Sequence, residues 1–330
     1  MVISPNRAVY RITVDGREVT DNLTSILLSL DVSLSATGET DSARFDLDDT
    51  NGMIAIPDVG KAVSIALGWV GRGARTVFEG TVDEVRSSGS RSGRTISISA
   101  KGFDAIGGSK GSKNRHWDDS TVATILGDAA STAGLDGADV DPGLSSIVIG
   151  YWAMIDESVL HMGQRLAQKI GGHFRISGRV AVMSSRGPAY APIATAFWGR
   201  DLISWDVTPG AARKQFGEVR APWFDRAAGV MRHETAKTGL KSKAVLTIDT
   251  CADQADAKRQ AKARAETSAR DAAVGRVRVD GNPAAVVDGQ VEIVGARPGV
   301  DGRYRIKAVR HSITRGGGFV TDIEIGQPQS

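Results

Sequence analysis

The sequence predicts an α+β protein that is mainly β and is built from more than one domain. Apolar and polar residues alternate with period two through the first hundred residues and again after residue 194, as in half-buried strands. Between these regions the period changes to that of amphipathic helices, over residues 118–170. The 330 residues also exceed the usual size of one hydrophobic core, so we expect two or three domains.

The first hundred residues are predicted to form a series of short strands. Residues 9–14 alternate strictly and end at Asp15-Gly16, a dipeptide that favours a hairpin because both residues tolerate a positive φ. The connections are rich in Gly, Ser and Asp, as turns require. Strands at this spacing predict a compact sandwich or barrel. Further strands are expected at residues 25–35, 41–48, 61–69, 76–86 and 94–101.

The middle of the chain predicts a small α+β unit. Residues 107–115 are rich in Gly, Ser and Lys and are expected to be a linker. A helix should then start at Asp118 or Asp119, which can cap it, and end at Gly134. A second helix is expected over residues 157–170 because Gly171 follows its last apolar position. Residues 173–183 should form a hairpin.

Strands return after residue 194, and one long helix interrupts them. Asp253 is a good helix cap, and alanine follows at every fourth position, at 257, 261, 265, 269 and 273. Such a stripe of small side chains lets a helix lie close to a sheet or to another helix. The strands are expected at residues 202–207, 215–221, 243–250, 276–280, 290–294, 302–312 and 318–326.

The composition is that of an ordinary globular protein, with 41% hydrophobic and 24% charged residues. The net charge of +3 is too small to indicate a dedicated nucleic-acid binder. Cys251 is the single cysteine, so the chain can form no internal disulfide. We expect no secretion signal, because residues 1–7 lack a charged-then-apolar layout, and no membrane anchor.

The residues that could carry chemistry do not form a recognisable site. The five histidines lack metal-ligand spacing, and no Gly-x-Ser-x-Gly segment lies on a strand–turn–helix. A metal site at His161 and His173, or at the acidic cluster around Asp46 and Asp48, remains open but is less favoured than solvated side chains. Cys251 is expected to be a buried structural thiol. The sequence therefore predicts neither an enzyme nor a cofactor.

Basic residues concentrate between residues 86 and 115, where Ser and Gly fill the gaps between them instead of the aromatics that stack on nucleic-acid bases. This pattern indicates a solvated or partner-facing loop more than a DNA contact. We expect the two loops at residues 71–75 and 86–94 to contact neighbouring subunits. The candidate contact residues in these loops are Gly71, Arg72, Arg75, Arg86, Arg91 and Arg94.

The order of several short motifs is more distinctive than any one of them. They are VYRITVDGREVT at 9–20, LDVS at 30–33, TGETDSARFDLDD at 37–49, TVATIL at 121–126, AGL at 133–135, ESVL at 157–160, RLA at 165–167, GGHF at 171–174, GRYRI at 302–306 and VRH at 309–311. In this order they resemble the late control D family, the baseplate hub proteins of phage-type tails, which are related to the hub part of type VI secretion spike proteins. Phe319 departs from the tyrosine that is usual in the family.

The resemblance implies two tail-tube-like β-barrel domains and a smaller α+β domain. The first barrel would be residues 1–105. The α+β domain would combine 106–192 with 236–274, and the second barrel would combine 193–235 with 275–330. Three copies of such a chain would present six similar domains, so a homotrimer could join a six-fold tail tube to a three-fold spike.

The resemblance also implies the partners and the location. They are a second and third copy of the chain, the tail tube protein, a spike protein (expected to be separate because the sequence ends at Ser330), and tape-measure and other baseplate proteins. DNA would only pass through the lumen. The protein would be part of the virion tail baseplate, assembled in the host cytoplasm. A cell-wall hydrolase used in injection and a DNA-contacting channel component are the alternatives.

Overall fold

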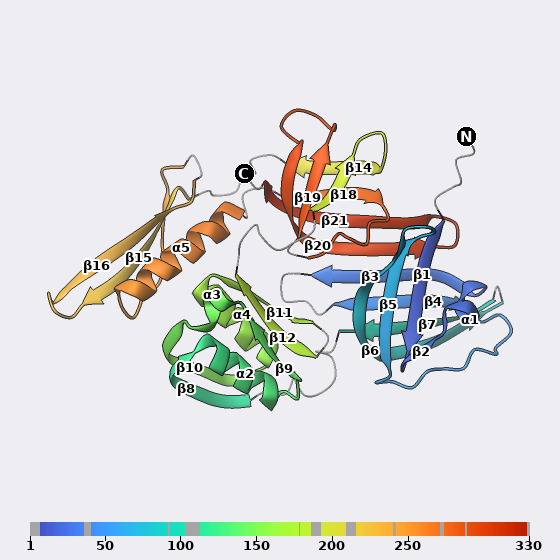
Figure 1. Ribbon diagram of the computed structural model, residues 1–330, viewed down its shortest axis with the longest axis horizontal. Helices are drawn as coiled ribbons and strands as arrows, with labels where there is room; N and C mark the ends of the chain where they lie inside the picture. Colours follow the sequence, from blue (N-terminus) through green and yellow to red (C-terminus); the bar gives the residue numbers. More distant parts are fainter. Residues whose placement is uncertain are drawn as a thin grey trace.

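The computed structural model describes residues 7–35, 41–91, 93–102, 113–177, 179–185, 193–208, 216–239, 242–270, 274–287 and 289–328. These residues form a 13-stranded sheet, an α+β unit, and a third group in which one helix covers three strands (Figure 1). The fold is thus mainly β with α+β parts, as the sequence predicts. Within the described residues, no helix has both the length and the apolar composition needed to cross a bilayer.

The N-terminal half of the large sheet, which we call the first module, comprises residues 8–101. Its strands are paired in the order β3-β4-β7-β6-β5-β1-β2, and every pair is antiparallel. The predicted hairpin at Asp15 and Gly16 is confirmed, since both residues have positive φ and join the first two strands. The elements are β1 (Ala8–Val14), β2 (Arg17–Glu18), α1 (Thr20–Thr24), β3 (Leu27–Ser35), β4 (Ser42–Asp48), β5 (Ala62–Trp69), β6 (Gly73–Ser90) and β7 (Gly93–Lys101).

The C-terminal half of the large sheet, which we call the second module, combines residues 193–208 with residues 274–328. The strand order is β14-β18-β21-β20, and β19 pairs with the first part of β20. β13 adds to β19 in parallel. The elements are β13 (Ile193–Phe197), β14 (Leu202–Thr208), β18 (Val274–Asp280), β19 (Gln290–Val294), β20 (Gly302–Thr314) and β21 (Gly318–Pro328).

One strand pair joins the two modules into a single sheet. β20 pairs antiparallel with β3, from Ala308 opposite Ser35 to Thr314 opposite Ser29. Each module still has its own hydrophobic core, one mainly from β3 to β7 and one from β13 to β21. The pairings among the described residues leave this sheet open, ending at β14 on one side and at β2 on the other.

The α+β unit lies between the modules in the sequence and contains β8 (Lys113–Thr121), α2 (Val122–Thr132), β9 (Gly137–Val140), α3 (Pro142–Ser145), β10 (Val148–Glu157), α4 (Val159–Ile170), β11 (Gly172–Ser177) and β12 (Val180–Ser185). The hairpin expected at 173–183 is confirmed as β11 and β12. The predicted cap at Asp118 or Asp119 is wrong, because both residues lie in β8. Thr121 caps α2 instead, since its side chain accepts a hydrogen bond from the Thr124 amide.

The predicted ends of the helices are confirmed. Gly134 follows α2 with a φ of 75°, and Gly171 ends α4 in the left-handed conformation. Residues 107–112 of the expected linker lie outside the described residues, and residues 113–115 already belong to β8.

The third group is inserted between β14 and β18 and contains β15 (Glu218–Asp225), β16 (Val230–Lys237), β17 (Val245–Thr247) and α5 (Gln254–Arg270). Its strands pair only with one another, so residues 218–235, which we expected in the second barrel, belong to a separate sheet. Asp253 caps the helix by accepting from the Asp256 amide at 2.8 Å. The alanine stripe is buried at Ala257, Ala261 and Ala265, and α5 packs against β15, β16 and α4. Ala273 lies outside the described residues.

The two modules repeat one strand pattern. The chain of pairs β3-β4-β7-β6-β5 in the first module corresponds to β14-β18-β21-β20-β19 in the second, with antiparallel pairing throughout. Their irregularities coincide as well. The pairing of β3 with β4 shifts between Leu27 and Ser29, and the pairing of β14 with β18 shifts between Leu202 and Ser204.

The sequences of the matched strands agree with this repeat. Residues 27–33 read LLSLDVS and residues 202–208 read LISWDVT, identical at four of seven positions. Residues 85–91 read VRSSGSR and residues 309–315 read VRHSITR, again identical at four of seven. The number of residues between matched positions differs for these two pairs of strands. The reason is that residues 209–273 separate β14 from β18 in the second module, whereas only residues 36–41 separate β3 from β4 in the first. The chain thus contains a duplicated module, and the copies are joined at β20 and β3.

Candidate assembly surfaces

The described residues do not gather the ligands of a metal site. No group of three or more His, Cys, Asp or Glu side chains among them is close enough to hold a metal ion. Asp46 and Asp48 lie on the polar face of β4, as expected. The Cys251 thiol is buried, and burial together with the nearby Asp256 raises its pKa to about 11, so it is a poor nucleophile.

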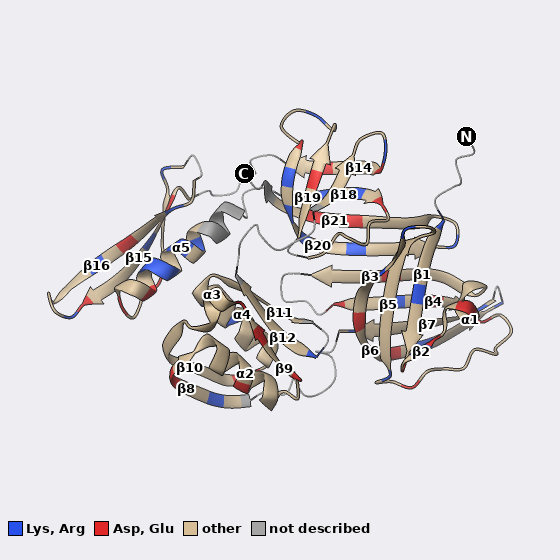
Figure 2. Cartoon of the chain, viewed as in Figure 1, with Lys and Arg blue, Asp and Glu red and all other residues tan. Residues whose placement is uncertain are grey.

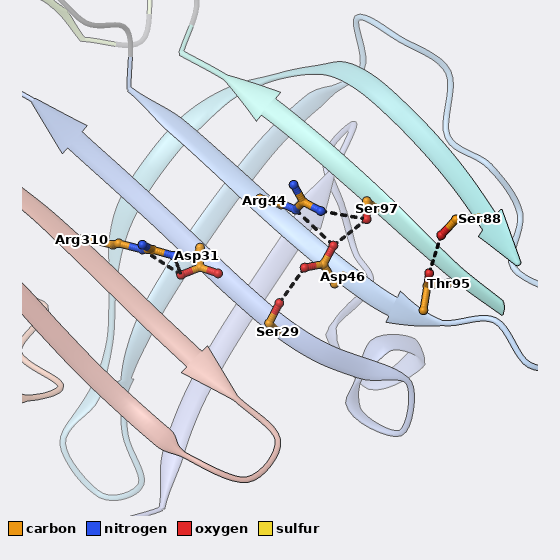
Figure 3. A network of polar contacts seen from close by, with 8 residues as sticks. All are labelled: Ser29, Asp31, Arg44, Asp46, Ser88, Thr95, Ser97 and Arg310. Carbon is orange, nitrogen blue, oxygen red and sulfur yellow. Dashed lines mark hydrogen bonds and ion pairs between the residues drawn. The ribbon is translucent and has the colours of Figure 1, made fainter. Parts of the chain in front are cut away.

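The polar side of the module boundary is held by one carboxylate. Asp31 Oδ1 on β3 accepts hydrogen bonds from Nε and Nη2 of Arg310 on β20, at 3.0 and 2.8 Å (Figure 3). The hydroxyl of Ser312 donates to the same oxygen at 2.6 Å. Just beyond the strand, the guanidinium of Arg315 donates to the Ser25 carbonyl. Charge-assisted bonds of this kind fix the register of two strands as well as holding them together.

A second polar network continues across the first module on the same face. Asp46 on β4 accepts from the hydroxyls of Ser97 and Ser29, at 2.6 and 2.9 Å, and from Arg44 at 3.1 Å (Figure 3). Partial burial alone would raise the pKa of Asp46, but these hydrogen bonds outweigh it and hold the pKa below its usual value. This face of the sheet is therefore a belt of mutually satisfied polar groups, and both signs of charge occur on the strands of the large sheet (Figure 2).

The core side of the boundary is closed by aromatic side chains from both modules. Trp69 on β5 donates its indole N–H to the Gly281 carbonyl at 2.7 Å, and its ring lies 5.5 Å from that of Phe319 on β21. His311 is fully buried beside them, with Nδ1 3.0 Å from Thr321 Oγ1. Burial lowers the pKa of His311 to about 4, so the imidazole is neutral at pH 7. The two modules thus share a continuous packed seam.

Among the unpaired strand edges in the described part of the large sheet, two bear on assembly. β14 pairs on one side only, with β18. β6 pairs with β5 through Thr81, and beyond that point it pairs with β7 alone. Large apolar side chains are exposed beside β14, namely Trp198, Ile203 and Val294. Unpaired strand edges of this kind are sites where another chain can add.

The residues expected to contact neighbours lie on the two hairpins of the first module. Gly71 and Arg72 form the turn between β5 and β6, and Arg75 follows in β6 on the half that is paired with β5; all three are exposed. Arg86 does not lie in a loop as predicted. β6 extends to Ser90, which places Arg86 within the strand, opposite Ser97.

The last two candidates lie at the far end of the same hairpin. Arg91 is in the turn between β6 and β7, and Arg94 is the second residue of β7. The loop predicted at 86–94 is therefore a long two-stranded ribbon. The serines and glycines of this segment suggested a turn, although polar residues also suit a strand that is solvated on both faces. Whether these residues contact a partner stays a prediction.

A shallow pocket of about 410 Å³ lies on the α+β unit, between β10 and α4. Tyr151 and Ile155 are exposed at its rim, and the Arg165 guanidinium lies 4.2 Å from the ring centre of Trp152. Arg165 also pairs with Glu157, which holds His161 at 2.8 Å. Lys169 is the other cation of the lining, so Glu157 balances one of the two positive charges. Sequence analysis missed it because β10 was not predicted.

The comparisons with known proteins place the chain among tail proteins. No family model matches it. The chain is 28% identical over 167 residues to the probable baseplate hub protein of Escherichia phage P2, covering 51% of this chain and 42% of the relative. It is 25% identical over 180 residues to the probable baseplate hub protein of Escherichia phage 186, covering 54% and 46%. The matched segments thus span a little under half the length of these relatives.

Solved structures show that the fold extends over the whole chain. A tail protein from Neisseria meningitidis superposes with a TM-score of 0.75 at 16% identity, covering 97% of both chains. A 43 kDa tail protein of prophage MuSo2 from Shewanella oneidensis gives 0.73 at 15% identity, covering 96% and 98%. A type VI secretion component of E. coli gives 0.60 at 12% identity, covering 98% and 77%. These names belong to structural tail components and not to enzymes, which agrees with the expectation of a structural protein.

Proposed function

We propose that this chain, which is similar to the baseplate hub proteins of phages P2 and 186, is a hub subunit that assembles into a trimeric ring. The ring adapts a six-fold tail tube on one side to a three-fold spike on the other. The subunit works by shape and contact. It is a component of the virion tail, built in the host cytoplasm before the particle leaves.

The observation that carries this proposal is the duplicated module. One chain holds two copies of the same strand pattern, already joined edge to edge in one sheet. Three chains then supply six equivalent modules, which match a six-fold partner, while the α+β unit and the α5 insert occur once per chain and so repeat three times. In the ring each module completes a tube-like barrel wall. Its partners are the tube protein, the spike protein and other baseplate proteins.

The mass of the purified chain in solution tests the proposal directly. Sedimentation equilibrium at micromolar concentration should give three times the chain mass of 34.8 kDa, and negative-stain images should show a three-fold ring with an open centre. Permanent assemblies of this kind commonly bury more than about 2,000 Å² per interface and do not dissociate at such concentrations. A stable monomer under these conditions would overturn the trimeric ring.

A further inference from the structure

Resting on the proposed ring, we propose how neighbouring copies join: the C-terminal part of β6 in one copy pairs antiparallel with β14 of the next copy. This joint would repeat, between chains, the joint that β20 and β3 make within each chain. The occupant of both unpaired edges is therefore a second copy of this same polypeptide. No other protein is needed to complete the sheet.

The register of the repeat carries the first step. β6 corresponds to β20, because each strand leads into a hairpin and shifts register with its hairpin partner at the equivalent position. The pairing of β6 with β7 shifts after Val82, and the pairing of β20 with β21 shifts after Ile306. From those shifts to the turns, the two strands have the same length. β14 corresponds to β3 through its pairing with β18. Within the chain, β20 pairs with β3. The equivalent partner of β6 is therefore β14, and each lacks a neighbour on that side among the described residues.

The equivalent residues form a matched set of charges. Arg310 and Asp31, which bond across the internal joint, correspond to Arg86 on β6 and Asp206 on β14. Both of the latter are exposed, and neither forms an ion pair within the described part of the chain. In the strand order of the sheet, β14 and β6 are separated by β18, β21, β20, β3, β4 and β7, so the two side chains do not meet in one copy. Across two copies they would form the same Arg–Asp bond.

Three further positions complete this agreement. Ser312, which donates to Asp31, corresponds to Ser88, whose hydroxyl lies 2.7 Å from Thr95 Oγ1 (Figure 3). When Thr95 is the donor in that bond, the Ser88 hydroxyl can donate to Asp206. Arg315, whose amide donates to the Leu28 carbonyl, corresponds to Arg91. The same contact between copies would join the Arg91 amide to the carbonyl of Ile203, the equivalent of Leu28. The candidate contact residues Arg86 and Arg91 thus acquire defined partners.

The apolar side chains of the new joint complement one another in size. Within the chain, Ile313 lies opposite Leu30. The equivalent pair between copies is Gly89 opposite Trp205, so a smaller residue on one strand accompanies a larger one on the other. Trp205 is only partly buried in the single chain, whereas Leu30 is fully buried. Trp205 is more exposed than Leu30 because β14 lacks the neighbouring strand that β3 has. In the ring, β6 of the next copy would cover the Trp205 side chain.

Geometry favours a ring from such a joint. The contact is head to tail, since it uses two different edges of the sheet, and head-to-tail contacts close into rings when the rotation per copy divides a full turn. Closure also pairs these two edges, which otherwise invite uncontrolled strand addition. The proposed register places Arg86 opposite Thr208, Ser87 opposite Val207, Ser88 opposite Asp206 and Gly89 opposite Trp205.

Cysteine cross-linking in the full-length chain tests the register. Ser87→Cys combined with Val207→Cys puts two thiols directly opposite each other, where Cα atoms of antiparallel strands lie about 4.5–5.5 Å apart, within disulfide range. Mild oxidation should give covalent dimers and closed trimers on non-reducing gels. The control pair, Ser87→Cys with Ile203→Cys, is four residues out of register, about 13 Å along the strand, and should cross-link at least about tenfold less. The buried Cys251 should leave the wild type uncross-linked.

A charge exchange tests the Arg86–Asp206 bond separately. Arg86→Asp or Asp206→Arg alone places like charges together and should weaken assembly by about tenfold or more, and the double exchange should restore it. Arg226→Asp is the matched control, because this exposed arginine lies in the turn between β15 and β16, outside the large sheet. It should assemble like the wild type.

The outcomes separate this inference from the proposed function. A trimer whose 87/207 pair cross-links no better than the control, or whose double exchange stays as weak as the single variants, overturns the β6–β14 joint and leaves the trimeric ring standing. A wild-type monomer that forms no cross-links overturns both. Cross-linking in the expected register together with rescue by the double exchange supports the joint, whatever partners the ring binds.

Discussion

Arg310 and Asp31 are 279 residues apart in the chain, yet the guanidinium of one lies 2.8 Å from the carboxylate of the other across the boundary between the two modules. A sheet that is continuous across two hydrophobic cores needs such a contact to set its register, because apolar packing tolerates a slip that hydrogen-bonded charges do not.

Removing that carboxylate charge should weaken the boundary. Asp31→Asn leaves the shape but replaces the anion that Arg310 and Ser312 share, so we expect about 1 kcal/mol less free energy of unfolding in urea titrations, a modest value because Arg310 is largely exposed. Arg276→Ala is the control, since its pair with Glu324 is exposed on both sides and should change stability by less than about 0.5 kcal/mol. Equal effects of the two variants would contradict the role assigned to Asp31.

A methyl group at Gly281 should disturb the seam. A Cβ built there would lie 2.0 Å from Cδ1 of Phe319, so the ring must move, and Gly281→Ala should lose about 1–3 kcal/mol of stability. Gly127→Ala provides the contrast. Gly127 lies inside α2 with open space around its Cβ direction, so alanine there should gain about 0.5–1 kcal/mol. Thermal or urea unfolding of both variants measures the difference, and a Gly281→Ala protein as stable as the wild type would argue against the tight contact.

His311 should make the protein less stable in mild acid. Its folded-state pKa of about 4 lies below the ordinary 6.5, so between these values the unfolded chain binds a proton that the folded chain does not. The neutral imidazole makes its full contribution to the free energy of unfolding above pH 6.5. This contribution decreases as the pH falls from 6.5 toward 4, and the total decrease is about 3 kcal/mol. Urea titrations of wild type and His311→Gln across this range should differ in slope. Parallel curves would show that His311 does not titrate as described.

The alanine stripe of α5 should not tolerate a larger side chain. Ala261 is fully buried where the helix packs on its sheet, so Ala261→Leu has no space and should lose about 1–3 kcal/mol. Ala255→Leu makes the same substitution on the exposed side of the same helix, so the change in helix propensity is the same. This variant should leave the free energy of unfolding nearly unchanged. Limited proteolysis should cut the insert faster in the first variant only. Equal rates in both would mean that the stripe does not hold the insert.

Sequence reasoning succeeded where local chemistry decides the structure. The ends of α4 follow from an apolar face and from Gly171, and the packing of α5 follows from its alanines. It failed where strands lack an alternating pattern. β16 is exposed along most of its length, so residues such as Arg232 and Glu234 gave no strand signal. Arg86 was assigned to a loop for the same reason.

The duplication escaped detection because its signal is split. The matching residues are separated by 175 positions in β3 and β14 but by 224 in β6 and β20, since the α5 insert interrupts the second module alone. A search for one fixed period cannot align both pairs. Strand pairing reveals the repeat because hydrogen-bond register is independent of how much chain is inserted between two strands.

The joint between β20 and β3 also changes how such a ring comes together. In a ring of three copies built as proposed, every second joint is formed when a chain folds and involves no collision between molecules. Only the remaining joints must overcome the loss of translational and rotational freedom on association, estimated at about 4–15 kcal/mol for each pair of proteins. Tethering two like units therefore allows a hexagonal object to form at protein concentrations too low for six separate pieces to find one another.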